Sequence, residues 1–329
     1  MKIFLSHKSA VQFWRTYGKP DSSRPRFSQK MLPPTPPTIP DQRQLAYIGQ
    51  SEPLNVLVAS SNSRRASKVL TAHLFSGPLP TRCLVRISDG FYVSSPEFCF
   101  LQAASKLPLV KLIELGFELC GRYAKTDSAT KSADATRTGK DPYNREQLTN
   151  TKKLSAFVGR LEGVAGKKRA LQALQYIADG SASPRETVLV MFLTLPYRLG
   201  GYGLPMPELN YLIIPAKSGR QYAGKSSFSC DLYWPQVKLA VEYDSDEFHS
   251  RDEEKAEDSI RRNVLISMGV KVISVDNQHI KSRTQLEGVA RQLSRNTSKR
   301  LHHRENPRFP EAQKRLREML LQSSSPDFW

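Results

Sequence analysis

The chain has 329 residues, 39% hydrophobic and 9% aromatic, which is enough to bury the cores of about two domains. It carries 49 Lys and Arg against 31 Asp and Glu, and a formal net charge of +18 favours a polyanionic partner such as nucleic acid, a ribosomal surface or an anionic membrane. No apolar run approaches the roughly 18 residues of a membrane span, the first residues are too weakly apolar for a signal peptide, and the four Cys form no CxxC pair. We therefore expect a cytoplasmic protein with no membrane span, zinc ribbon or disulfide framework.

Residues 1–123 predict a small α+β domain. Ser6 opens a short helix, seven prolines in 20–40 indicate an extended arm, and 54–59 read as a buried strand. Asp89-Gly90 lies between two strand-like runs, which is typical of a hairpin. Ser95-Pro96 then starts a helix, and a second helix is expected over 107–123.

Residues 124–150 have few large apolar side chains, so we expect a linker or mobile loop there. The second domain is expected over 151–329, with a core at 183–276 and a basic helical tail at 281–329. Helices are predicted at 151–161, 167–178, 183–196, 252–268, 281–297 and 310–321, and strands at 209–214, 227–234, 237–244 and 270–275. Three strands followed by a helix and a fourth strand indicate a mixed sheet with helices on both faces.

An acidic segment interrupts the basic chain. Residues 241–260 contain nine acidic and two basic side chains. Clustered carboxylates repel one another unless a cation neutralises them, and hard divalent cations take oxygen ligands. The alternative is the solvated face of an acidic helix.

Strand geometry suggests where three of these acids meet. Because side chains alternate along a strand, Glu242 and Asp244 share one face of 237–244, and Cys230 lies opposite Asp231 and Tyr233. If Pro235-Gln236 is a tight two-residue turn, Asp231 faces Ala240 and Glu242 is its diagonal neighbour. The acids Asp231, Glu242 and Asp244 should then converge beside the carbonyl of Tyr243, as ligands for Mg²⁺ or Mn²⁺. The alternative is a hairpin with surface acids.

The same residues carry a family resemblance. Cys230-Asp231-Leu232-Tyr233-Trp234-Pro235, then Leu239-Ala240-Val241-Glu242-Tyr243-Asp244, then Asp258-x-x-Arg261-x-x-x-Leu265-x-x-x-Gly269-Val270, resembles the Vsr-like, restriction-endonuclease-like domains of the PD-(D/E)XK superfamily. The likeness spans about 183–276, and the inferred α-β-β-β-α-β order is the one that this superfamily has. Within it, the stretch is similar to a bacterial family reading DxxxPxxxLxxExDGxxxH followed by DxxRxxxLxxxGxxV.

The resemblance implies metal-dependent hydrolysis of phosphodiester bonds. Asp231 and Glu242 take the places of the metal-binding acids, and the cation would polarise a phosphate oxygen, help to generate hydroxide and stabilise the leaving 3′-oxygen. Asp244 stands where many relatives have a catalytic Lys, although the narrower family commonly has Asp there. Ser245 replaces the Gly of the narrower pattern, and His249 follows one residue later than its His, as a candidate general base or phosphate contact.

Three further residues have both a structural and a functional interpretation. Glu186 completes the capping box Ser183-Pro184-Arg185-Glu186, and related nucleases also carry an acid on the first core helix. Arg261 either contacts phosphate or pairs with acids such as Asp258. Lys238 is expected on the strand face of Glu242, as a partial substitute for the missing Lys or as an ordinary strand-end charge. The glycines of 199–204 lack a phosphate-loop pattern and predict a loop, so no organic cofactor is expected.

The first half has a shorter resemblance. Gly90-Phe91-Tyr92-Val93-Ser94-Ser95-Pro96-Glu97 is similar to a stretch of AbiEi-type antitoxin and regulator proteins, which implies nucleic-acid binding or contact with a protein partner. The leading hypothesis from the sequence is a cytoplasmic Mg²⁺- or Mn²⁺-dependent endonuclease acting on DNA. The alternatives are a non-catalytic DNA-binding regulator with a degenerate nuclease fold, and RNA as the substrate.

Overall fold

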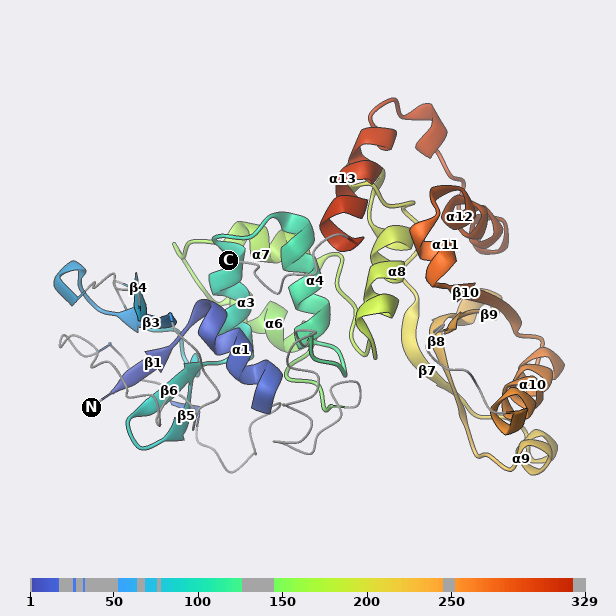
Figure 1. Ribbon diagram of the computed structural model, residues 1–329, viewed down its shortest axis with the longest axis horizontal. Helices are drawn as coiled ribbons and strands as arrows, with labels where there is room; N and C mark the ends of the chain where they lie inside the picture. The colour runs from blue at the N-terminus through green and yellow to red at the C-terminus, as the bar shows by residue number, and fades with distance from the viewer. Residues whose placement is uncertain are drawn as a thin grey trace. The chain divides into compact units, whose positions relative to one another are not determined.

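The computed structural model describes residues 2–17, 26–27, 32, 53–63, 69–75, 78–125, 145–244 and 252–321. The chain divides into two compact units, the first running to Ile177 and the second beginning at Ala178. Each unit contains a mixed β-sheet flanked by helices, so the protein is of the mixed α/β class (Figure 1). The proline-rich arm at 20–40, most of the expected linker at 124–150, and His249 lie largely or wholly outside the described residues.

The first unit consists of a six-stranded sheet and a group of helices. Its elements are β1 (Ile3–Leu5), α1 (His7–Tyr17), β2 (Arg26–Phe27), β3 (Leu54–Val58), β4 (Leu70–Leu74), β5 (Leu84–Ser88), β6 (Phe91–Ser94), α3 (Pro96–Ala104), α4 (Leu109–Leu119), α6 (Thr151–Gly159) and α7 (Lys167–Leu174). The strands lie in the order β2-β5-β6-β1-β3-β4, and β1 runs parallel to β6 but antiparallel to β3.

Helix α3 is central to the core of this unit. Every one of its residues is buried, and it packs against α1, α4, α6 and α7. The expected start is confirmed, because the Ser95 hydroxyl accepts a hydrogen bond from the N–H of Phe98 and Pro96 occupies the first turn. The expected hairpin is also confirmed: β5 and β6 pair antiparallel, and Gly90 in the turn has a left-handed φ of 76°.

Helices α6 and α7 belong to this first unit. The sequence had suggested that they belong to the second. The contacts of α3 with α6 and α7, and of α4 with α7, place residues 151–177 in the first unit. The difference arises because the buried face of each short helix is narrow, so its partner cannot be identified from its own periodicity.

The second unit is built on a four-stranded sheet. Its elements are α8 (Pro184–Thr194), β7 (Glu208–Ile213), α9 (Lys217–Ala223), β8 (Phe228–Trp234), β9 (Leu239–Asp244), α10 (Asp252–Ser267), β10 (Lys271–Asp276), α11 (Asn277–Lys281), α12 (Arg283–Thr297) and α13 (Phe309–Leu321). The strand order is β10-β9-β8-β7, with β10 parallel to β9 and the other pairs antiparallel. The predicted order of helix, three strands, helix and strand is confirmed, with α9 as an unexpected addition.

Helices enclose this sheet. Figure 1 shows the sheet between α8 and α10. Helix α8 is buried along nearly its whole length, from Glu186 to Thr194. Leu265 of α10 packs with Cys230, Ala240 and Val270. The acids of β8 and β9 therefore lie on the two central strands of the sheet between these helices.

The turn between β8 and β9 is longer than the sequence suggested. Residues Pro235–Val237 form a 3₁₀ turn that ends at Lys238 with φ 48°, and the strands pair Leu232 with Val241 and Tyr233 with Ala240. The predicted pairing of Asp231 with Ala240 is therefore wrong by two residues. One step further in the observed register, Asp231 lies level with Glu242 itself.

The loop at 199–204 packs against α13. Gly200 has φ 89°, and a Cβ at that position would collide with the backbone of Ala312 in α13. This close approach of the two backbones is reason enough for a glycine at position 200, and no bound phosphate is needed to account for it. Of the helices that the structure describes, none has the length and apolar character that crossing a membrane would need.

Candidate functional site

Asp231 ends the regular pairing between the two central strands. The ladder between β8 and β9 covers Leu232, Tyr233 and Trp234, and at the next position the Asp231 carboxylate accepts a hydrogen bond from the N–H of Tyr243 at 2.7 Å. A side chain thus replaces a backbone carbonyl as the acceptor. The strands can separate here without leaving that N–H unsatisfied.

Glu242 lies beside this position and is only 8% exposed. Its Oε2 accepts a hydrogen bond from Nη2 of Arg261 at 2.6 Å, and Arg261 also donates to the carbonyl of Ser229. The thiol of Cys230, which is a weak donor, lies near the carboxylate. The other oxygen, Oε1, is buried without a hydrogen-bond partner among the described residues.

Glu186 brings a third carboxylate from α8. Its N–H donates to the Ser183 hydroxyl, while its Oε2 accepts from the N–H of Ala182 at 2.9 Å and from the amide of Asn210 at 2.8 Å. Ser183 caps the helix as predicted, but the predicted return contact of the capping box is not formed, because the Glu186 side chain accepts from the N–H of Ala182 and not from that of Ser183. The functional role also stays open, because Asp231 acts on the same carboxylate electrostatically.

Burial and like charge act together on these three acids. Burial, followed by the charge of Asp231, raises the pKa of Glu186 from its usual 4.5 to about 7, and the same two causes raise the pKa of Glu242 to about 7 in spite of Arg261. Burial also raises the pKa of Asp231, which the Tyr243 N–H and Arg261 oppose and Asp244 reinforces. The site is therefore a group of mutually repelling carboxylates with one internal cation.

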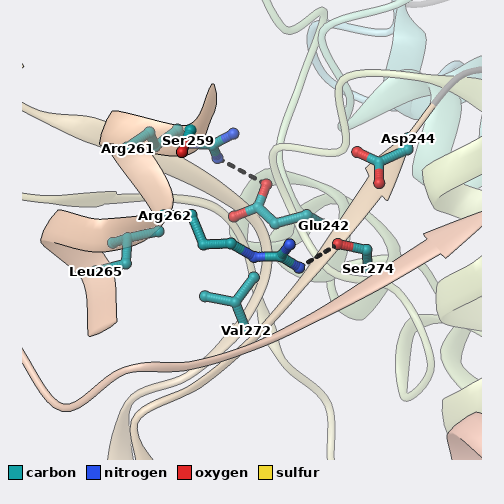
Figure 2. Close-up of a pocket in the computed structure, with 8 residues that line it drawn as sticks. All are labelled: Glu242, Asp244, Ser259, Arg261, Arg262, Leu265, Val272 and Ser274. Carbon is teal, nitrogen blue, oxygen red and sulfur yellow. Dashed lines mark hydrogen bonds and ion pairs between the residues drawn. The ribbon is translucent and has the colours of Figure 1, made fainter. Parts of the chain in front are cut away.

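A pocket of about 370 Å³ lies beside α10, and Glu242 is the member of this group that lines it. Figure 2 shows Glu242 with guanidinium groups on either side of it, Arg261 paired with its carboxylate and Arg262 turned toward β10. Nη2 of Arg262 donates to the Ser274 hydroxyl at 2.8 Å, and Ser274 pairs with Glu242 in the parallel register of β9 and β10. Asp244 lines the same pocket at the exposed end of β9. The pocket therefore combines carboxylates with two guanidinium groups.

Of two basic residues singled out from the sequence, Lys238 lies elsewhere than expected, whereas Arg261 makes one of its two expected contacts. Lys238 precedes β9 and its Nζ donates to the carbonyl of Met268, so the expectation that it shares a strand face with Glu242 is wrong. Of the two roles considered for Arg261, contact with phosphate or pairing with an acid, the structure shows an ion pair, and its partner is Glu242. The side chain of Asp258 lies outside the described residues.

Strand alternation also fails at one point. Cys230 and Tyr233, expected on opposite faces, pack in the same apolar cluster with Ala240. The neighbouring strand β7 is irregular at the same level: Asn210 has φ 48°, and the pairing of β7 with β8 passes over it. A local break in the pleat changes which side chains share a face.

Sequence reasoning missed Asn210, Arg262 and Ser274. Asn tolerates the left-handed conformation better than most residues, but a single Asn within a strand pattern does not announce it. Arg262 is one basic residue of many, and its position depends on how α10 lies across β10. Only the register of the parallel pair brings Ser274 next to Glu242.

The donor set suits a hard divalent cation. The unpartnered Oε1 of Glu242 offers a buried acceptor, and the repulsion between Asp231 and its neighbours would fall if a cation bound there. Within the described part of the chain, no group of three or more His, Cys, Asp or Glu side chains stands ready to hold a metal ion. Asp231 and Glu242 therefore fit as part of a ligand set, with Arg261 as a competing cation.

The fold and this site define a two-unit α/β protein with a buried, partly neutralised acid cluster in its second unit. Two proteins of Mycobacterium tuberculosis, one from strain CDC 1551 / Oshkosh and one from strain H37Rv, both described as uncharacterised, are each 32% identical to the chain over 109 residues. The match covers 32% of this chain and 35% of each relative, so the chain spans about a third of the curated relatives it matches. No family model and no solved structure matches the chain.

Proposed function

We propose that the protein is a metal-dependent endonuclease that hydrolyses phosphodiester bonds in nucleic acid, with DNA as the favoured substrate. The observation that carries this proposal is the proximity of a buried carboxylate, Glu242, and a half-buried one, Asp231, at the point where two central strands separate beside a pocket. Buried acids without full compensation are costly to keep, and functional sites are where such groups gather. The order of the second unit, which is α-β-β-β-α-β with α9 inserted after the first strand, supports a restriction-endonuclease-like core.

In this proposal the chain's own residues divide the work. Asp231 and Glu242 would hold Mg²⁺ or Mn²⁺, with Asp244 at the mouth of the pocket as a further candidate ligand. When bound, such a cation supplies Lewis-acid polarisation of the phosphate and offsets the charge that builds up on it. Arg262, which is exposed and lines the pocket, is placed to contact a backbone phosphate. Glu186, with a pKa raised to about 7, can hold or release a proton at neutral pH.

A nicking assay tests the proposal. Supercoiled plasmid and single-stranded RNA are incubated with Mg²⁺, Mn²⁺ or EDTA and the wild-type chain, Asp231→Asn, Glu242→Gln or Glu208→Gln. Glu208 is an exposed acid of β7 in the same sheet, so its variant controls for loss of charge alone. We expect metal-dependent cleavage by the wild type and Glu208→Gln only. Equal background from all four proteins on both substrates would refute the enzyme.

A second candidate function is a DNA-binding regulator that keeps the fold without catalysis. The observation in its favour is the ion pair of Arg261 with Glu242, because a guanidinium already provides charge compensation at the acid cluster. This candidate predicts salt-dependent binding that needs no metal and survives both substitutions. The antitoxin-like segment at 90–97 would then belong to a unit that contacts DNA or a protein partner.

A further inference from the structure

A second pocket, of about 400 Å³, lies entirely within the first unit. Its lining includes Thr81, Arg82, Glu97, Lys153, Phe157 and Arg160. Three of these side chains are basic and one is acidic. The pocket is therefore electropositive, and it stands apart from the acid cluster of the second unit in both composition and sequence.

Local structure sets the basic side chains around this pocket. Lys153 lies in the first turn of α6, where its N–H is capped by the side chain of Asn150, and Arg160 follows the last residue of the same helix. Arg82 lies in the turn before β5 with a left-handed φ of 63°, an uncommon conformation for a residue other than Gly. The turn is held on either side of Arg82, where Cys83 donates to Pro80 and accepts from Ser95.

Lys153 and Arg160 have cationic ends available for a ligand. In the described part of the chain, neither side chain makes a hydrogen bond or an ion pair, and both are exposed. A ligand anion can therefore bind them without first displacing an internal partner. The neighbouring acid does not offer that partner, because Glu97 is 3% exposed and accepts a hydrogen bond from the Thr149 hydroxyl at 2.7 Å.

An aromatic wall completes the pocket. Phe157 is half-buried, and its ring contacts that of Phe98 with centroids 6.3 Å apart. A half-buried ring beside cationic side chains is the combination that proteins use to stack a base and hold its phosphate. A simple inorganic anion would use the cations but not the ring, whereas a nucleotide uses both.

We propose that this pocket binds a nucleoside monophosphate unit, with its phosphate held by Lys153, Arg160 and Arg82 and its base against Phe157. The unit can come from a free nucleotide or from single-stranded nucleic acid. Guanidinium and ammonium groups together provide the several donors that phosphate oxygens accept. Binding here requires no hydrolysis and no metal, so the inference is independent of the proposed nuclease.

Binding to the full-length protein tests this pocket. Adenosine 5′-monophosphate, adenosine, inorganic phosphate and a labelled six-nucleotide single strand are titrated in EDTA at low salt. The pocket variant is Lys153→Gln/Arg160→Gln. The matched control, Lys152→Gln/Arg122→Gln, removes the same charge from exposed residues of the same unit that do not line the pocket. Unchanged thermal melting of both variants confirms that they fold.

We expect the pocket variant to bind the monophosphate or the single strand about tenfold more weakly or worse, and the control to bind like the wild type. For the single strand, the slope of log affinity against log salt should become shallower by about 0.7, since the single phosphate held in the pocket is no longer neutralised. Phe157→Leu should weaken binding of the monophosphate but not of inorganic phosphate.

The two sources of the ligand give different outcomes. Binding of the single strand identifies nucleic acid, whereas binding of the monophosphate alone identifies a free nucleotide. Equal weakening in the pocket variant and the control would show general charge attraction and overturn the proposal. Equal affinity for adenosine and its monophosphate would also overturn the proposal, as would the absence of binding by every phosphate ligand. None of these results depends on whether the second unit cleaves DNA.

Discussion

Nη2 of Arg261 lies 2.6 Å from Oε2 of Glu242, while Oε1 of the same carboxylate has no hydrogen-bond partner among the described residues. One guanidinium therefore compensates an acid that burial and Asp231 both disfavour in its charged form. The stability of the second unit should therefore depend on the charge of the Arg261 side chain.

Replacing Arg261 by Gln should destabilise the second unit. Removing one partner of a largely buried ion pair leaves the other uncompensated, which costs about 3 kcal/mol. The loss should appear in urea unfolding at pH 8, and Mg²⁺ should restore more stability to this variant than to the wild type. Arg262→Gln is the matched control, because Arg262 is exposed and donates a hydrogen bond to the neutral Ser274. Equal stability of both variants would contradict the prediction.

The acid cluster should make the second unit less stable as pH rises. Glu186 and Glu242 have folded pKa values of about 7 against a usual 4.5, so the folded state keeps protons that the unfolded chain has released. Their contribution to stability is complete below pH 4.5 and is lost as pH rises through 7. The loss is up to about 3 kcal/mol for each group.

Hydrogen exchange of peptides from β8 and β9, measured at pH 5 and pH 8 and corrected for intrinsic rates, measures this effect. We expect weaker protection at the higher pH, and a much smaller difference in Glu186→Gln/Glu242→Gln. Glu208→Gln should behave as the wild type. Equal protection at pH 5 and pH 8 in the wild type would show that the two acids titrate as ordinary carboxylates and would contradict the prediction.

The first unit should respond to acid in the opposite direction. Glu118 is buried, which alone would raise its pKa, but Arg15 donates to both of its oxygens at 2.8 Å and the pKa falls to about 2. Burial and His73 lower the pKa of His7 to about 3. Both groups contribute stability that is present at neutral pH and lost as pH falls through their folded pKa values.

Arg15→Met isolates the ion pair of Glu118. We expect a loss of about 3 kcal/mol at pH 7 and a smaller further loss on acidification, as judged by exchange of peptides from α1 and α4. Arg86→Met removes the exposed pair of Arg86 with Asp89 in the same unit and should cost less than about 1 kcal/mol. Similar losses in the two variants would indicate that the Glu118 pair is no stronger than a surface pair.

Asn210 should show the cost of a left-handed residue inside a strand. Its φ is 48°, and its amide donates to Gly180 and Glu186. Asn210→Gly and Asn210→Ala both lose these hydrogen bonds, but only Ala retains the steric penalty of its Cβ, so the Ala variant should be less stable by about 1 kcal/mol. Urea midpoints give this difference directly, and a more stable Ala variant would argue for an ordinary strand conformation.

Local elements were predictable because their signals lie within a few residues. The turn at Asp89-Gly90, the cap at Ser95 and the end of α10 at Gly269, with φ 76°, all follow from the conformational preferences of single residues. Strands β1 and β4 were missed because short segments have too little periodicity to stand out, and their pairing with β3 provides the stabilisation. Asp231 and Glu242 were singled out from residue type and spacing, and in the observed register the two lie level on neighbouring strands.

The sequence alone determined the order of the elements in the second unit and the identity of the acids on its two central strands, because both depend on local patterns. Tertiary structure decided which residues meet. A 3₁₀ turn ending at Lys238 shifted the register so that Asp231 lies level with Glu242, and the path of α10 placed Arg261 against the same carboxylate. These contacts join residues 11 to 19 positions apart, and packing of the whole unit selects them from many pairings that local preferences allow equally.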